Sequence, residues 1–405
     1  DAPLKAVTVF AMPMILGSFF QQIYNMADTI IVGKFVGNAA LAAVGSCGTL
    51  MFLILGFLMG LTAGFTVVTA QHYGAGNMKA MRQSVASAAI LSAAVSLLMT
   101  VGSMAMMRHI LHWMNTPTDM YDQAYSYIMV ICGGIAAQVL YNLLASVLRA
   151  LGDSKRPLYF LILAALLNIA LDLVFIIVFH MGAAGAAYAT VISQGISGLL
   201  CLWYIAKKVP ELHLHREDFY DLKDAAVLHL KTGFPMGVQM SVMCIGQLAM
   251  QAVVNSLGTA AVAGYTAASK ADQLSVLVNN AMMTAISNYV AQNFGAGKKD
   301  RIRQGVRACL IQTEAFNLFM CVGILILRHP IVRMFLSDPT QEIYHYSDMY
   351  LTIVAPFYFI LGLLAVYRTS IQSMQNGRAP FTACMIELVM RIIATVGMAG
   401  ILGYT

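Results

Sequence analysis

The sequence is poor in charged residues and in the side-chain groupings that form reactive or metal centres. Asp, Glu, Lys and Arg make up only 10% of its 405 residues, against roughly 25% in a soluble domain. A soluble protein of this length would need far more polar surface. None of the seven cysteines forms a CxxC pair, which argues against a disulfide framework or a zinc site. No Ser/His/Asp or Cys/His arrangement and no ATP-binding motif stands out, so neither a membrane enzyme nor an ATP-driven pump is indicated.

Hydrophobic residues, by contrast, make up 59% of the chain, and the mean hydropathy is +0.74. Runs of about 20 or more apolar residues predict membrane-spanning helices. Eleven such runs occur, at approximately 6–33, 41–70, 83–107, 121–148, 157–179, 183–206, 228–255, 260–291, 304–327, 343–372 and 380–404. The sequence therefore predicts an all-α polytopic protein embedded in a lipid bilayer.

The basic residues indicate how the protein is oriented in the membrane. Of the 24 Lys and Arg, 17 lie in the loops after the even-numbered helices and four in the loops after the odd-numbered ones. Because cytoplasmic loops carry the excess of Lys and Arg, this bias places the N-terminus in the cytoplasm of a multi-pass inner (plasma) membrane protein. The net charge of +6 thus reflects membrane orientation and does not indicate a nucleic-acid partner.

The sequence also contains an internal duplication. Three motifs of the first half recur in the second at an offset of 221 or 222 residues: AMPM (11–14) as GFPM (233–236), VGNAALAA (36–43) as LGTAAVAG (257–264), and TAQHYGAGN (69–77) as VAQNFGAGK (290–298). Six spans per repeat is an even number, so the two halves point the same way across the membrane. Parallel repeats are a recognised transporter plan, with the substrate path between the halves.

The repeat defines the expected domains. We expect an N-lobe of six helices at 1–206, a polar cytoplasmic linker at 207–227 and a C-lobe at 228–405. The second half ends one helix short of the first, so a twelfth helix is expected to be missing from this chain. Later in the repeat, Pro157 corresponds to Pro380 at an offset of 223.

Four motifs are distinctive in their order and spacing: YNMADTIIVGKFVG (24–37), QHYGAGN (71–77) with its partner QNFGAGK (292–298), LRALGDSKRP (148–157) and NIALDLVFI (168–176). Together they resemble the multidrug and toxic compound extrusion (MATE) family of secondary transporters, over essentially the whole chain. The resemblance implies two pseudo-symmetric six-helix lobes around a central V-shaped cavity, with eleven of the twelve helices present here. It also implies export of organic cations or other amphipathic compounds in exchange for H⁺ or Na⁺, without ATP or a bound cofactor.

The chain departs from one branch of that family. Branches typified by the norfloxacin exporters place a carboxylate on the seventh membrane-spanning helix and another on the tenth, which correspond here to the predicted spans 228–255 and 343–372. Here the helix 7 stretch 238–247 contains none, and neither does 351–372. The chain looks closer to the DinF-like branch, whose carboxylates cluster on helices 1 and 5.

Asp172 stands in the middle of the apolar run LLNIALDLVFIIVF (166–179), where an ionisable group costs at least ~2.5 kcal/mol in a bilayer. At about 1.5 Å per residue, Asp172 and Thr190 lie about 10 Å, and Asp28 about 8 Å, from the outer surface. Asn168 is one turn below Asp172 on the same helix face. The resemblance implies that these four residues form the ion site of the N-lobe, since they match the Asp of NMAD, both residues of NxxxD and the Thr of YAT.

The chemistry of the four side chains suits ion coupling. Burial and a second carboxylate both disfavour the charged form, so the pair can take up a proton outside and release it when the cavity rehydrates. The same four residues also offer an all-oxygen cage suited to Na⁺. We favour proton coupling. The alternative is that Asp172 only bonds Asn168 and Thr190 to fix helix packing.

The duplication supplies an internal comparison for this site. Asp28 aligns with Met250, Asn168 with Arg391 and Asp172 with Thr395, so the carboxylates of the first half have no counterpart in the second. Two charge pairs are expected in the second half, Glu387 with Arg391 and Lys270 with Asp272. We interpret both as compensated pairs that fix helix packing, rather than as a gate or a substrate contact.

Candidate substrate-cavity residues follow two helix faces. On helix 7, polar and soft side chains recur every four residues, and helix 1 and the inner end of helix 4 add others. The candidates are Gln21, Asn25, Asn142, Gln239, Met243, Gln247 and Gln251. Interhelical polar packing is the alternative for any single one of them.

These observations predict a monomeric antiporter that exports amphipathic, mainly cationic, small molecules by alternating access between two lobes. A lipid-linked oligosaccharide or lipid flippase of the same wider superfamily is the alternative. That activity should need several cationic cavity residues, and only Lys270 and Arg391 lie well inside the predicted spans. Arg368, near the end of the run 343–372, is counted with the loop that follows.

Overall fold

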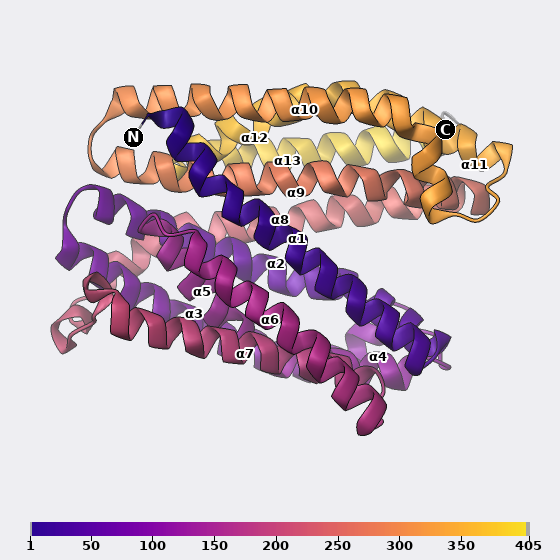
Figure 1. The fold of residues 1–405 in the computed structure, drawn as a ribbon, viewed down its shortest axis with the longest axis horizontal. Coiled ribbons are helices and arrows are strands. Elements are labelled where there is room, and N and C mark those ends of the chain that lie inside the picture. The colour runs from indigo at the N-terminus through magenta and orange to yellow at the C-terminus, as the bar shows by residue number, and fades with distance from the viewer. Residues whose placement is uncertain (1, 402–405) are drawn as a thin grey trace. The chain divides into compact units, whose positions relative to one another are not determined.

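The computed structural model describes residues 2–401 and is almost entirely helical (Figure 1), with no β-strand in this range. The first half contains α1 (Pro3–Phe35), α2 (Asn38–Gly74), α3 (Met78–Trp113), α4 (Tyr121–Gly133), α5 (Ile135–Ala150), α6 (Lys155–Leu173) with the π-helical segment η1 (Val174–Val178), and α7 (Ala183–Lys208). The second half contains α8 (Lys223–Ser256), α9 (Thr259–Gly295), α10 (Lys299–Phe335), α11 (Gln341–Val354), α12 (Tyr358–Ser373), and α13 (Arg378–Ile392) with the π-helical segment η5 (Ile393–Ile401). The predicted all-α class is confirmed.

Each predicted span is helical, although two of them are interrupted. The predicted helix 121–148 bends by 47° at Gly134, where the main chain lies against the side chain of Val191 on α7. The predicted helix 343–372 changes to a 3₁₀ turn at Ala355–Phe357, which contains Pro356 and so lacks one backbone donor. The last residues of the predicted helix 380–404 lie outside the described range.

Most of these helices are long enough and apolar enough to cross a membrane. Within the described residues, nine helices are long and apolar enough to cross a membrane, and the bent pair α4 and α5 makes a tenth if it is one span. The long helix α9 is not among them; it carries Lys270 and Asp272. The chain is therefore a polytopic membrane protein, as predicted.

The internal duplication appears in the backbone of the turns. Gly37 and Gly258, at equivalent positions, both have positive φ (127° and 106°), and so do Gly76 and Gly297 (74° and 71°). These values lie in the region that glycine adopts without steric cost. The sequence Gly-Ala-Gly at 74–76 and at 295–297 thus ends α2 and α9, and the same turn geometry recurs in both halves.

The duplication also fixes the register of α6 and α13. The two helices begin at Lys155 and Arg378, an offset of 223, and each has proline as its third residue. Proline is well suited to a first turn because the N–H that it lacks has no partner there. Each helix continues into a π-helical segment, η1 or η5. Residues 168 and 391 therefore occupy the same place in equivalent helices.

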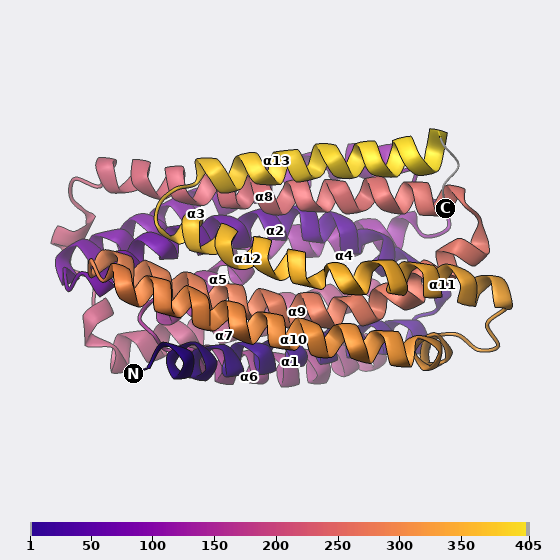
Figure 2. The same ribbon diagram turned by 90° about the horizontal axis from the view of Figure 1, so that it is seen from above.

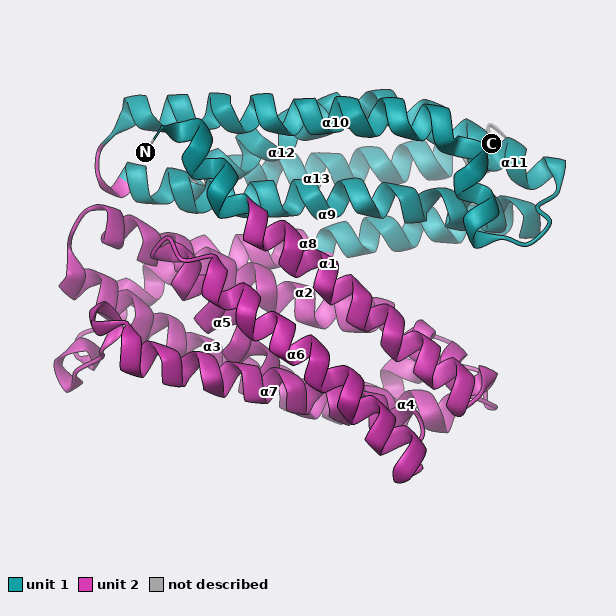
Figure 3. Ribbon diagram, in the orientation of Figure 1, with its two compact units in different colours: residues 1–11, 242–294, 298–405 teal, residues 12–241, 295–297 magenta. Residues whose placement is uncertain are grey.

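The chain divides into two compact units (Figure 3). Unit 1 comprises residues 1–11, 242–294 and 298–405, and unit 2 comprises 12–241 and 295–297. The boundaries fall within α1, α8 and α9. The stretch 207–227, predicted as a linker, contains short 3₁₀ turns and belongs to unit 2, where Asp218 forms an ion pair with Arg82 at 3.4 Å.

Each unit has its own packed interior. In unit 2, α7 packs along α5 and α6, and α2 packs along α3 and α5. In unit 1, α10 packs along α12 and α11, and α13 runs beside the second half of α8 (Figure 2). The long apolar side chains that remain exposed, such as Leu97, Leu98 and Val101 on α3, are those expected to face lipid.

Unit 2 contains a close helix contact built from glycines. Gly60 and Gly64 of α2 face Met236 and Gly233 of α8, and a Cβ added at Gly60 would lie 2.6 Å from the Met236 carbonyl oxygen. A Cβ at Gly64 would overlap the backbone of Gly233. Small residues allow membrane helices to approach this closely. The glycines therefore determine the spacing between α2 and α8.

Gly64→Ala is expected to lower the free energy of unfolding by about 1–3 kcal/mol, because the added methyl group must displace backbone atoms. The control is Gly48→Ala on the same helix, where an added Cβ meets nothing within 4 Å. That variant should be neutral or stabilised by up to about 1 kcal/mol. Thermal unfolding of the solubilised protein measures both, and equal effects would contradict the close contact.

Candidate functional site

The four residues predicted to form an ion site all lie in unit 2. Asp28 is on α1, Asn168 and Asp172 are one turn apart on α6, and Thr190 is on α7. Because α6 packs along α7, Asn168 reaches Thr190, and Thr190 in turn reaches Asp28. The structure therefore brings together side chains that the sequence places as far as 162 residues apart.

The site is linked by a short chain of hydrogen bonds. The Asn168 amide donates to the Thr190 hydroxyl at 3.1 Å. That hydroxyl lies 3.0 Å from the Ala186 carbonyl oxygen and 3.5 Å from Oδ2 of Asp28. A hydroxyl has one proton, so Thr190 can donate to Asp28 only when it releases Ala186. The threonine thus contributes a donor that can change partner.

The buried oxygens of the site outnumber its donors. Asp172 has no exposed surface, and within the described part of the chain neither of its carboxylate oxygens has a hydrogen-bond donor. Oδ1 of Asp28 and Oδ1 of Asn168 are also buried without a donor there. Buried acceptors are almost always satisfied in folded proteins. The site therefore lacks a donor or a cation, and a proton or a small cation would supply what is missing.

The two carboxyl groups are neighbours. Asp28 and Asp172 lie close enough to interact electrostatically. A hydrogen bond between two carboxyl groups requires one of them to be protonated, since ionised carboxylates only accept. One shared proton would turn a repulsive pair into a bonded one.

A monovalent cation is the other species that the site fits. Carboxylate, amide and hydroxyl oxygens are ligands for hard cations such as Na⁺. Among the described residues, no group of three or more His, Cys, Asp or Glu side chains gathers as a metal site. The alternative reading of Asp172, as a residue that bonds Asn168 and Thr190, does not match the observed contacts. Those two residues bond each other, and within residues 2–401 Asp172 accepts a hydrogen bond from neither.

The predicted substrate-cavity residues are divided between the units. Gln21, Asn25, Asn142 and Gln239 belong to unit 2, and Met243, Gln247 and Gln251 belong to unit 1. Gln21, Asn25, Met243 and Gln247 are exposed, Asn142 and Gln251 are half-buried, and Gln239 is buried. Gln251 donates to Asn255 at 2.8 Å, as the packing alternative anticipated. Whether these residues line one cavity stays a prediction.

Two residues near the carboxylates were not predicted. Tyr24, on α1 one turn before Asp28, is buried and lies near Gln21, Gln194 and Asp28. Tyr127, on α4, is buried within electrostatic range of both carboxylates. The spacing of Tyr24 from Asp28 could have indicated its position. Tyr127 reaches the site only through the packing of α4 in the unit, which no local pattern reveals.

Comparison with known families gives a match over most of the chain. The MatE family model matches twice, at residues 13–174 and 235–396. The two matches are separated by 222 residues, which agrees with the internal duplication. Each match contains five of the predicted spans or parts of them.

Individual relatives agree with the family match. A probable multidrug resistance protein, YpnP of Bacillus subtilis, is 32% identical over 361 residues, covering 89% of this chain and 80% of its own length. A probable multidrug resistance protein, NorM of Thermotoga maritima, is 25% identical and covers 95% of this chain and 83% of its own. A solved outward-facing structure of a multidrug resistance MATE family transporter superimposes with a TM-score of 0.88 at 22% identity, covering 98% and 87% of the two chains.

Proposed function

The chain belongs to the MatE family of multidrug efflux transporters, and on that premise we propose that it exports amphipathic compounds in exchange for protons bound at Asp28 and Asp172. The protein is a transporter and not an enzyme, as the names of its relatives indicate. Its substrates are small molecules, and the driving force is an ion gradient. It acts as a monomer in the inner membrane, with its N-terminus in the cytoplasm.

One observation supports this proposal above the others. The site has a fully buried carboxyl group, Asp172, near a half-buried one, Asp28, and in the described residues no Lys, Arg or His forms an ion pair with either. Intramembrane acids without a partner are costly and generally mark ion pathways. A helix-packing role would be served as well by residues that need no neutralisation.

The proposed exchange follows from the donors and acceptors of the site. When the site faces the outside, a proton binds between Asp28 and Asp172 and removes their mutual repulsion. Thr190 keeps its bond to Ala186 while the proton is present, and turns to Asp28 when the proton leaves. The protonated and deprotonated states thus favour different packing of α1 against α6 and α7, which is the two-state element that alternating access requires.

Uptake of ethidium into inside-out vesicles tests this function. The protein is expressed in a host that lacks its own exporters, and inside-out vesicles are prepared from it. When respiration acidifies the vesicle interior, ethidium should be taken up, which is measured as a loss of external ethidium fluorescence. A protonophore should abolish this uptake. Vesicles without the protein are the control. Uptake that needs a sodium gradient and ignores the protonophore would assign Na⁺ to the site, and the absence of uptake under either gradient would contradict the proposal.

A further inference from the structure

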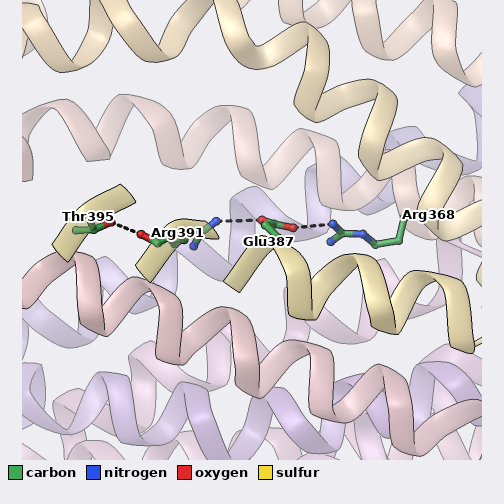
Figure 4. Close-up of polar contacts among 4 residues, drawn as sticks. All are labelled: Arg368, Glu387, Arg391 and Thr395. Atoms are coloured by element: carbon green, nitrogen blue, oxygen red, sulfur yellow. Dashed lines mark hydrogen bonds and ion pairs between the residues drawn. The ribbon is translucent and has the colours of Figure 1, made fainter. Parts of the chain in front are cut away.

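Three charged side chains of unit 1 are bonded in a row (Figure 4). Glu387 of α13 accepts from Arg368 of α12 at 2.6 Å and from Arg391 of α13 at 3.1 Å. We call these three residues the arginine triad. The expected compensated pair of Glu387 and Arg391 is therefore incomplete, because Arg368, counted from the sequence as a loop residue, lies within α12 and joins it.

The arginine triad carries a net positive charge. It has two guanidinium groups and one carboxylate, and Nε of Arg368 is buried without an acceptor. Asp272 does not complete it: Tyr358 and Tyr350 donate to its two oxygens at 2.6 and 3.3 Å. In the described residues, neither Asp272 nor Glu314 forms an ion pair with these arginines. An excess charge within a membrane-spanning region is costly and calls for a partner.

Arg391 is the accessible end of the triad. Its side chain is 31% exposed, against 15% for Arg368. It lines a small pocket of unit 1 with Val242, Met243 and Gly246 of α8. A Cβ at Gly246 would lie 3.4 Å from its Nη1, so the glycine leaves room for the guanidinium beside α8. Met243, in the same pocket, is one of the predicted substrate-cavity residues.

Equivalent positions of the two halves carry side chains of opposite hydrogen-bonding character, acceptors in the first half and donors in the second. Residues 168 and 172 of α6 correspond to 391 and 395, as the helix starts and the prolines confirm. The first half has an amide and a carboxylate with unsatisfied acceptors. The second half has a guanidinium, which only donates. The Thr395 hydroxyl donates to the Arg391 carbonyl oxygen at 2.6 Å and, being neutral, does not offset the charge of the guanidinium. A cation fits the first position and an anion the second.

We propose that Arg391 binds a carboxylate of the transported compound, so that zwitterionic and acidic amphiphiles are among the substrates and are preferred to their uncarboxylated analogues. This inference rests on the proposed export function and specifies its substrate class. Arg391 lies about 20 Å along the helix from the start of α13, so it is well inside a hydrocarbon layer about 30 Å thick. Lipid headgroups stay at the membrane surface, so the acid belongs to a compound inside the protein. Arginine forms its strongest contacts with planar carboxylates, as it already does with Glu387.

Equilibrium binding to the purified full chain tests the inference. Rhodamine B and its ethyl ester share one cationic ring system and differ in a single carboxylate. We expect tighter binding of the acid than of the ester, measured by fluorescence anisotropy. Arg391→Gln should weaken binding of the acid about tenfold, the value of one charge-assisted hydrogen bond, and change binding of the ester less than about twofold. Arg391→Lys should keep part of the preference.

Glu387→Gln is the discriminating variant. It removes the carboxylate that competes for Arg391 and raises the net charge of the triad, so it should tighten binding of the acid. A purely structural triad predicts the opposite, since either substitution would then weaken both probes alike. Equal effects on acid and ester, or weaker acid binding in Glu387→Gln, would overturn the inference. Because no gradient is applied, a failure of ion-driven export would leave this comparison unaffected, and the two proposals fail separately.

Discussion

Asp172→Asn is expected to reduce gradient-driven ethidium uptake to the level of vesicles that lack the protein. The asparagine keeps the shape of the side chain but cannot bind or release a proton. The charge of residue 172 therefore no longer changes during the transport cycle. It also supplies the donor that Asp28 lacks, which should hold the site in its proton-loaded arrangement. Equilibrium binding of ethidium should persist, because the substituted residue acts in coupling.

The control is Asp119→Asn, in the exposed loop before α4. It removes a carboxylate of the same type outside the site and should leave uptake unchanged. Both variants should elute from size-exclusion columns and unfold thermally like the parent. Normal uptake by Asp172→Asn would reduce this residue to a packing role.

Asp28→Asn should cause a loss as large as Asp172→Asn, and the double variant should be no worse than either single one. The reason is that two groups that share one proton act as a unit, so removing either removes the whole step. Initial rates of ethidium uptake by the two single variants, the double variant and the parent form a double-mutant cycle. Each variant should be compared at equal protein content.

Independent, multiplying losses in the double variant would show that the two carboxylates act at separate steps. Asp28→Asn with a small effect would assign coupling to Asp172 alone, with Thr190 as its neighbour on α7. Either result would contradict a shared proton while leaving export itself in place.

The helices and the repeat could be read from the sequence because both depend on local pattern. Runs of apolar residues long enough to cross a bilayer predicted the helical segments, and the recurrence of glycine predicted equivalent turns. The break at Gly134 could not be read in the same way. It depends on the side chain of Val191, on another helix, and a lone glycine in a long apolar run does not show what packs against it.

The depth of the predicted ion-site residues could be read from the sequence because it follows from helix rise, whereas their role came from the family resemblance. Counting residues from the helix ends placed Asp28, Asp172 and Thr190 at one level, and in the structure Thr190 contacts both Asp28 and Asn168. The arginine triad was not predictable. Arg368 lies near the end of the apolar run 343–372 and was counted with the loop that follows, and its pairing with Glu387 depends on the packing of α12 against α13.

Proton movement driven by substrate is the most direct test of the central claim that the Asp28 and Asp172 pair couples export to protons. The purified protein would be reconstituted in liposomes containing the pH indicator pyranine, and ethidium added outside. We predict that ethidium entry drives protons out and raises the internal pH, and that Asp172→Asn abolishes this signal while still binding ethidium. An undiminished pH signal from Asp172→Asn would contradict the assignment of coupling to this pair.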